Sequence, residues 1–240
     1  MRLNKYIAQA GICSRRKADE FIQKGQVKVN DKVVTDMSFQ VRVKDKVYID
    51  NHLIRPMNLQ YYKFNKPAGY ITTMDDEKGR KTIYDILPKE LHHLKPVGRL
   101  DKDSTGLLIL TNDGNLINAL THPSLKVPKV YHVTVSGRVS DKAFKELAQG
   151  IEIEEGKIAY ADIIVLEQTN KSTFMEVTLM QGMNRQIRKM FEKVGYEVEI
   201  LKRIQHATIK LDGLKRGEVK VLKPKAIREL QEFVKRRADA

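Results

Sequence analysis

The apolar run Leu107-Leu108-Ile109-Leu110 constrains the fold of this chain more than any other short segment. Consecutive branched apolar residues bounded by turn residues are typical of a buried strand. A charged turn at residues 98–106 leads directly into this run. The turn carries two carboxylates, Asp101 and Asp103, beside Arg99. Placing a charged side chain next to a buried strand costs free energy, unless the charge is paired or takes part in catalysis or binding. The segment therefore has two interpretations, an ion pair at a surface turn or a carboxylate kept for chemistry.

The first 50 residues predict a compact unit of two helices and a hairpin. Apolar residues at helical spacing indicate the first helix. Ser14 stands at the N-cap position of the second helix. Two short alternating runs, 26–29 and 32–34, predict the hairpin. A further alternating run at 41–49 is expected to complete the unit.

Residues 51–59 mix turn residues with a proline and predict a linker between two domains. In the second domain, residues 60–240, helices interrupt strands without regular alternation. This order favours an α+β fold, with a mixed, mostly antiparallel β-sheet flanked by helices, over a doubly wound one. We expect strands at 61–65, 70–73, 130–135, 158–166, 174–180 and 197–204, helices at 115–120, 141–150 and 184–194, and a basic C-terminal helix at 225–237.

The charge of the chain points to a polyanionic partner. Its net charge is +14, from 44 Lys and Arg against 30 Asp and Glu. Such an excess in a folded chain most often indicates nucleic-acid binding. No apolar run approaches the roughly 20 residues that span a bilayer, and residues 1–7 lack the apolar core of a signal peptide. We therefore expect a cytoplasmic protein with no membrane partner. The single cysteine, Cys13, excludes an internal disulfide and a cysteine-rich zinc site.

Three cations occupy the first turn of the second predicted helix, in the string Ser14-Arg15-Arg16-Lys17. Acidic residues are normally favoured at this position, because the helix dipole is positive there. A phosphate docked on the exposed N–H groups would offset the cost. The alternative is three solvated surface cations.

This pattern resembles the small RNA-binding domain first described in a ribosomal small-subunit protein. The resemblance covers residues 1–49 and rests on residues 2–7, 14–18 and 25–32. It implies that RNA is contacted by Arg2, Lys5, Ser14, Arg15, Arg16 and Lys17. Several RNA enzymes and ribosome-associated proteins carry such a domain, so it identifies RNA binding and no particular reaction.

Two interpretations of the Asp101 region fail. The string Asp101-Lys102-Asp103-Ser104-Thr105 fits the Asp-x-Asp-x-Thr pattern of aspartate phosphotransferases, but those enzymes need a helical crossover and further carboxylates for Mg²⁺. A metal site built on His92-His93 fails as well, because adjacent side chains on a strand face opposite ways.

The third interpretation fits more of the chain. The motifs Gly98-Arg99-Leu100-Asp101, Thr105-Gly106-Leu107-Leu108 and Thr111-Asn112-Asp113-Gly114 resemble the catalytic motif of pseudouridine synthases, in the branch that acts on ribosomal RNA, the RsuA/RluB type. Support comes from residues 62–69 with Asn65-Lys66-Pro67, from 129–133 and from 181–190. Met183 departs from this pattern, because the family usually has an arginine there.

The resemblance implies a uridine-to-pseudouridine isomerase without cofactor or metal. It puts the essential aspartate on Asp101, and Asp103 becomes a turn residue. Arg188 is implied to pair with the catalytic aspartate, and Tyr131 to stack on the target base. Leu201 is implied to pack on the other side of the base, with Ile200 as the alternative one position earlier. In an extended segment, Arg99 would share a face with Asp101.

The expected partner is ribosomal RNA or a pre-ribosomal particle, with a monomeric enzyme. Large-subunit RNA is preferred, because the basic helix and residues 98–114 resemble the members that act on it. Small-subunit RNA stays an alternative, because residues 61–73 resemble that branch. A non-catalytic RNA-binding or ribosome-assembly protein is the competing class.

Overall fold

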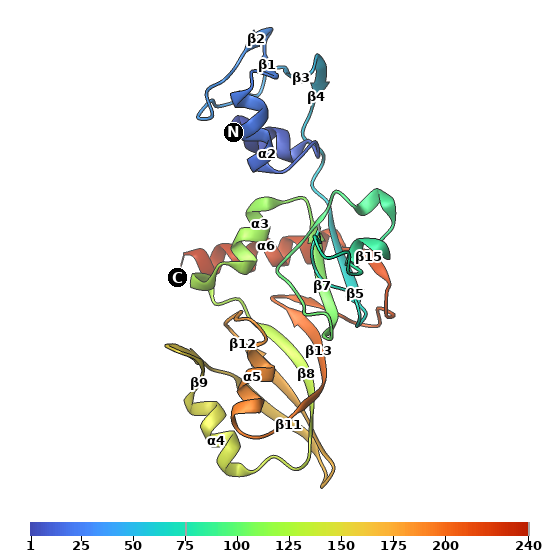
Figure 1. Ribbon diagram of the computed structural model, residues 1–240, viewed down its shortest axis with the longest axis vertical. Helices are drawn as coiled ribbons and strands as arrows, with labels where there is room; N and C mark the ends of the chain where they lie inside the picture. Colours follow the sequence, from blue (N-terminus) through green and yellow to red (C-terminus); the bar gives the residue numbers. More distant parts are fainter. Residues whose placement is uncertain (75, 240) are drawn as a thin grey trace. The chain divides into compact units, whose positions relative to one another are not determined.

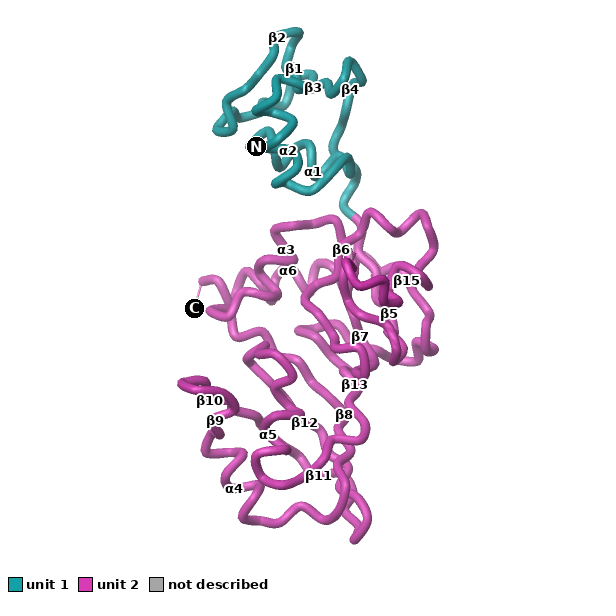
Figure 2. Tube along the Cα trace, viewed as in Figure 1, with its two compact units in different colours: residues 1–59 teal, residues 60–240 magenta. Residues whose placement is uncertain are grey.

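The computed structural model describes residues 1–74 and 76–239 (Figure 1). The chain divides into two compact units, Met1–Leu59 and Gln60–Ala240, coloured separately in Figure 2. None of the helices within the described residues is long and apolar enough to cross a membrane.

Two short helices build the first unit, α1 (Leu3–Gln9) and α2 (Arg15–Gln23). The side chain of Ser14 accepts a hydrogen bond from the Lys17 N–H at 3.2 Å and so caps α2, which confirms the predicted N-cap. Leu3 and Ile7 of α1 and Ile22 of α2 are fully buried in a common core, so one apolar face of each helix points inward.

The sheet of the first unit has the order β2-β1-β3-β4 and is antiparallel. Its strands are β1 (Val27–Val29), β2 (Lys32–Val33), β3 (Val47–Ile49) and β4 (His52–Ile54). The run at 41–49 is a strand only over its last residues. The segment expected as a linker contains β4, because His52 to Ile54 pair with β3 in register across a tight turn.

The second unit is built on a mixed sheet. Over the described residues this sheet has nine strands, seven of them in the order β11-β12-β8-β13-β7-β5-β15, with β14 paired to β13 and β6 to β7. Neighbours are antiparallel except β13 and β7, which run parallel. The strands are β5 (Tyr61–Lys66), β6 (Lys95–Pro96), β7 (Thr105–Thr111), β8 (Lys129–Ser136), β11 (Asp162–Gln168), β12 (Ser172–Leu179), β13 (Val198–His206), β14 (Ile209–Lys210) and β15 (Val219–Val221). This arrangement confirms the predicted α+β class.

Strand β7 is buried on both faces, as its unbroken apolar run predicts. Leu108 and Leu110 pack into one core of the second unit. Leu107 and Ile109 point to the opposite face and pack into another. Successive side chains of a strand alternate between faces, so a run without polar positions needs cover on both sides. The charged turn before β7 therefore stands at the end of a fully enclosed strand.

Helices cover both faces of this sheet. They are α3 (Gly114–Thr121), α4 (Asp141–Gln149), α5 (Gln186–Lys193) and α6 (Pro224–Ala238), with short 3-10 helices at Ile83–Asp85, Lys89–Leu91 and Pro123–Leu125. Helices α3 and α6 contribute Leu116, Leu120 and Leu230 to the core beside Leu107. The predicted apolar stripe of α5 is confirmed, because Ile187, Met190 and Phe191 are buried in the core beside Leu108.

One predicted strand is wrong, and another is divided into two. Residues 70–73 make only an isolated bridge, between Ile71 and Thr82. The run at 158–166 is split, with β10 (Lys157–Ala159) paired to β9 (Ile151–Glu154) and β11 paired to β12. Periodicity continues across the break, so it gives no sign that the chain changes sheets.

Gly106 lets β7 and β13 approach each other at their parallel contact. It has φ +103°, and a Cβ built at this position would lie 2.2 Å from the Arg203 carbonyl oxygen. Gly106 and Arg203 are register partners, so a side chain here would force the two strands apart. The glycine thus fixes how closely the charged turn comes to β13.

Candidate active site

A cleft of about 1490 Å³ opens in the second unit beside the charged turn. Residues 98–104 form one wall, and residues 178–187, which lead into α5, line another part. The cleft brings together Arg99, Asp101, Tyr131 and Leu201, four of the side chains singled out in the sequence. Arg188 is not among the lining residues. Arg99 is exposed, and within the described residues it forms no ion pair with Asp101.

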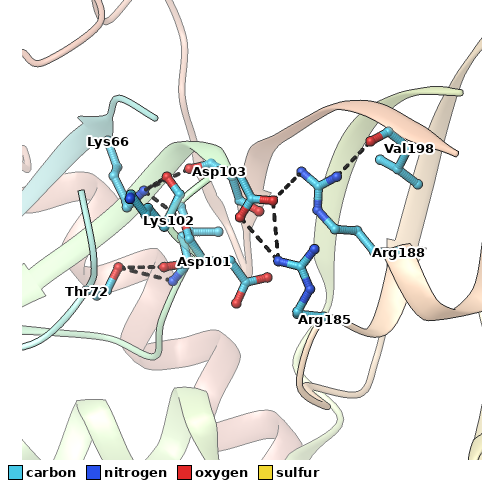
Figure 3. A network of polar contacts seen from close by, with 10 residues as sticks. Lys66, Thr72, Asp101, Lys102, Asp103, Arg185, Arg188 and Val198 are labelled. Atoms are coloured by element: carbon cyan, nitrogen blue, oxygen red, sulfur yellow. Dashed lines mark hydrogen bonds and ion pairs between the residues drawn. The ribbon is translucent and has the colours of Figure 1, made fainter. Parts of the chain in front are cut away.

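Lys66, at the end of β5, holds the backbone of the charged turn. This side chain is fully buried. Its Nζ donates to the carbonyl oxygens of Asp101 at 2.9 Å and Ser104 at 2.8 Å, with longer contacts to those of Pro67 and Lys102. Figure 3 shows the amine facing these carbonyls. Burial lowers the pKa of Lys66 to about 8, and the charges of Asp101 and Asp103 oppose that change.

Two further contacts fix the same turn. The Thr72 hydroxyl donates to the Leu100 carbonyl at 2.8 Å and accepts from the Leu100 N–H at 3.3 Å. The Gly69 N–H donates to the Lys102 carbonyl at 2.8 Å. Four carbonyls of this turn thus accept hydrogen bonds, while no hydrogen bond or ion pair between described residues uses the carboxylate of Asp101. The geometry presents one half-buried carboxylate to the cleft on a rigid backbone.

The arginines bind the other carboxylate of the turn. Arg185 Nη1 lies 3.2 Å from Asp103 Oδ1, and Arg188 Nη2 lies 3.4 Å from Asp103 Oδ2 (Figure 3). Arg188 also donates to the Val198 carbonyl at 2.7 Å. The implied pairing of Arg188 with Asp101 is therefore absent here. Asp103 does lie in the turn as expected, but it also forms the ion pairs with Arg185 and Arg188.

The pKa of Asp103 follows from these neighbours. Partial burial alone would raise it, but the N–H of its own residue and the charges of Arg188 and Arg185 hold the pKa below its usual range. Arg185 reaches Asp103 from the N-cap position of α5, where its backbone is left-handed with φ 50°. A negative side chain near the N-terminus of a helix is also favoured by the helix dipole.

Tyr131 and Leu201 lie on the neighbouring strands β8 and β13, and both line the cleft. Leu201 pairs with Val133 and Arg203 with Tyr131 in the β13–β8 register. Tyr131 and Leu201 are 9% and 7% exposed. Ile200, the alternative to Leu201, is 56% exposed and is not a lining residue. The structure thus places Leu201 in the cleft wall.

Polar residues that the sequence argument passed over also line the cleft, among them Lys129, Arg203 and His206. Arg203 stands two residues after Leu201, so strand alternation alone would have placed it on the same face. Lys66 could have been found in the same way, because it follows the buried Phe64 by two residues.

Among the described residues, no group of three or more His, Cys, Asp and Glu side chains is placed to hold a metal ion. His92 Nε2 contacts the Leu87 carbonyl at 3.1 Å, and His93 Nε2 contacts Gln60 Oε1 at 3.1 Å. The adjacent histidines thus have separate protein partners.

Comparison with protein families decides the class of this chain. The model described as RNA pseudouridylate synthase matches residues 60–193, more than half of the chain, and the S4 domain model matches residues 1–47. The chain belongs to the RNA pseudouridylate synthase family. It is therefore an enzyme that isomerises uridine in RNA, with an N-terminal S4 domain for RNA binding.

Relatives of this pseudouridine synthase are similar over nearly its whole length. The ribosomal large subunit pseudouridine synthase B of Bacillus subtilis (strain 168) is 39% identical, over 96% of this chain and 95% of that protein. The protein of the same name in Yersinia pestis is 37% identical, over 97% and 76%. A crystal structure of a pseudouridylate synthase is 30% identical, covers 96% of this chain and 99% of that one, and superposes with a TM-score of 0.69.

The S4 domain of this pseudouridine synthase exposes four of its five predicted RNA-binding cations, while the fifth, Lys5, is half-buried. Arg2, Arg15, Arg16 and Lys17 are exposed. Lys17 forms an ion pair with Glu20 at 2.8 Å, and the hydroxyl of Ser14 is engaged in capping α2. No acidic residue stands in the first turn of α2. Arg15 and Arg16 thus carry net positive charge next to exposed helical N–H groups, as an RNA phosphate would require.

Proposed function

We propose that this pseudouridine synthase modifies a uridine of large-subunit ribosomal RNA, with Asp101 as its catalytic residue. The name shared by the Bacillus subtilis and Yersinia pestis relatives supports the RNA target. One structural observation supports the residue. Asp101 presents a carboxylate to the cleft from a backbone that Lys66 and Thr72 hold in place.

The cleft suits a base taken out of its stack. The reaction breaks the bond from ribose C1′ to ring N1 and forms a bond from C1′ to ring C5. C5 gives up its proton and N1 takes one up. An enzyme that works on a base must extrude it and hold it against flat or apolar side chains. In our proposal the base lies between Tyr131 and Leu201, Asp101 engages the sugar or the base, and Arg99 at the rim contacts the RNA.

Arg188 has a supporting role in this proposal. Its ion pair with Asp103 ties α5 to the turn, so the carboxylate of Asp101 stays available to substrate. We further propose that RNA reaches the cleft through the S4 domain cations, and that a monomer acts in the cytoplasm on ribosomal RNA or a pre-ribosomal particle.

Tritium release tests the catalytic assignment. Transcripts of both ribosomal RNAs made with uridine tritiated at C5 should lose tritium to water on incubation with the protein. Asp101→Asn keeps the shape and removes the charge, so release should fall by at least 1,000-fold while RNA binding is kept. Asp103→Asn is the matched change at the neighbouring carboxylate, and should slow release without abolishing it. Full activity of Asp101→Asn would refute the assignment.

Mapping pseudouridines in cells with and without this gene tests the RNA target. We expect a modified site in large-subunit RNA to disappear on deletion and to return with the wild-type gene, but not with Asp101→Asn. A site lost from small-subunit RNA would refute the target. Unchanged modification with impaired subunit maturation would favour the assembly-protein class.

A further inference from the structure

Three basic side chains meet at one end of the cleft, on the same two strands that carry Tyr131 and Leu201. Lys129 of β8 and His206 of β13 are register partners, and Arg203 is the partner of Tyr131. All three line the cleft. Lys129 is half-buried, while Arg203 and His206 are 2% and 0% exposed. Cations from adjacent strands are thus packed together below the cleft surface.

A buried donor of this cluster has no hydrogen-bond partner among the described residues. Arg203 Nε donates to the Leu107 carbonyl at 2.7 Å, but its buried Nη2 has no hydrogen-bond partner. Within residues 1–74 and 76–239, none of the three side chains forms an ion pair with a carboxylate. A buried guanidinium with an open N–H is costly, because the desolvated charge has nothing to offset it. The cost favours an anion at this end of the cleft.

Lys129 is the member of the cluster that a ligand can reach. Its Nζ donates to the Val127 carbonyl at 2.9 Å and keeps further N–H groups available. Burial first, and then the charge of Arg203, together lower the pKa of Lys129 to about 8. The pKa of His206 falls well below its usual value, first through burial and then through both cations, with a small opposing effect from the Leu120 backbone. The cluster therefore combines the amine of Lys129 and the guanidinium of Arg203 with a histidine that is held toward its neutral form.

The basic cluster lies one step along the strands from Tyr131 and Leu201, the side chains proposed to hold the base. Lys129 precedes Tyr131 by two residues on the same face of β8, a step of about 6.6 Å along a strand. Arg203 likewise follows Leu201 on β13. A base held between Tyr131 and Leu201 would thus have cations about one strand step away. This spacing suits the phosphate group that adjoins the nucleoside.

We propose that Lys129, with Arg203 behind it, binds a backbone phosphate next to the target nucleotide. The proposal rests on the proposed function, because it takes the cleft as the place where that nucleotide enters. It assigns to these residues a subsite for one phosphodiester anion. Lys129 donates to a non-bridging oxygen, and the charge of Arg203 adds to the attraction through the protein interior.

Salt dependence of RNA binding tests this subsite. Each phosphate contact contributes roughly 0.7 to 0.9 to the slope of log affinity against log salt concentration. Filter binding of a large-subunit ribosomal RNA transcript is measured between 50 and 400 mM salt. Lys129→Gln should weaken binding about tenfold at the lowest salt and reduce the slope by close to one contact. Lys129→Arg should restore both values.

Lys202→Gln is the matched control. Lys202 precedes Arg203 on β13, points to the opposite face and does not line the cleft, so the same loss of charge should leave the slope unchanged. A merely structural role for Lys129 would lower the melting temperature of Lys129→Gln but leave its slope at the wild-type value, and that result would overturn the proposal. Absence of tritium release by the wild type would instead count against the proposed function, and the slopes would still be measured.

Discussion

The two walls of the cleft are held by different kinds of contact. The turn that carries Asp101 is fixed through its backbone, by the buried amine of Lys66 and the hydroxyl of Thr72. The segment leading into α5 is joined to that turn by Arg185 and Arg188, whose shared partner Asp103 is half-exposed. Buried hydrogen bonds are expensive to remove, because they leave carbonyls without partners. Exposed ion pairs contribute about 0 to 1 kcal/mol.

This difference has a functional meaning. The wall that must hold a carboxylate in one position uses contacts that cannot be exchanged with water. The opposite wall uses charged side chains that can release and rebind. In the proposed function this cleft admits an extruded nucleotide, and it would then need both properties, because one side must be preorganised and the other must open.

Lys66→Met should cause the largest loss of stability among these variants, and it tests the wall that carries Asp101. Methionine fills similar space but cannot donate, so the carbonyls of Asp101 and Ser104 lose a buried partner. We expect the free energy of unfolding to fall by about 3 kcal/mol and tritium release to fall at least tenfold. Urea denaturation and the release assay measure the two quantities.

Lys63→Met is the matched control on the same strand. Lys63 is only half-buried and donates to the carbonyls of Lys210 and Leu211, which lie away from the turn. Its removal should cost less than about 1 kcal/mol and leave activity near wild type. Equal urea midpoints for the two variants would contradict the distinction between the walls.

Comparing Arg188→Gln with Arg185→Gln tests how much each arginine contributes to the wall that is held by ion pairs to Asp103. The side chain of Arg188 is 14% exposed and also holds the Val198 carbonyl, while that of Arg185 is 43% exposed. We expect losses of about 1 to 2 kcal/mol for Arg188→Gln and below about 0.5 kcal/mol for Arg185→Gln. In a chain of this size, 1 kcal/mol shifts the melting temperature by about 2 to 4 °C, so thermal unfolding separates them. Equal shifts in melting temperature for the two variants would show that the hydrogen bond from Arg188 to the Val198 carbonyl adds no stability.

Some features of the two walls can be predicted from the sequence, and others depend on contacts between distant residues. Local patterns suffice for the buried run at 107–110, the Ser14 cap and the stripe of α5, because each depends on neighbours within a few residues. Family resemblance places Asp101, Tyr131 and Leu201 in one cleft. The role of Lys66 could not be predicted from local sequence, because its acceptors Asp101 and Ser104 stand more than 30 residues away.

The sequence motif does not predict whether Asp101 or Asp103 pairs with Arg188. Both carboxylates lie in one turn, and a motif cannot tell which of them faces a helix that begins about 80 residues later. That outcome depends on how the turn is clamped and on how β7 meets β13 at Gly106. The break at Tyr160-Ala161 is similar, because it depends on pairing partners rather than on local pattern.

Asp103→Asn should have a small effect on stability, and it tests whether charge alone joins the two walls. The pKa of Asp103 is lowered in the folded protein, so its contribution to stability is fully present above the pKa of the unfolded chain, about 4, and is lost as the pH falls through the folded value. The difference in unfolding free energy between wild type and Asp103→Asn should be below about 1 kcal/mol at pH 7. This difference should become smaller below pH 4, because Asp103 then becomes protonated. It should also become smaller at pH 7 in 1 M salt, because salt screens the attraction between Asp103 and the two arginines. A difference that persists at pH 3 would mean that Asp103 holds the turn by its shape, and the wall that carries the arginines would then be as fixed as the one that carries Lys66.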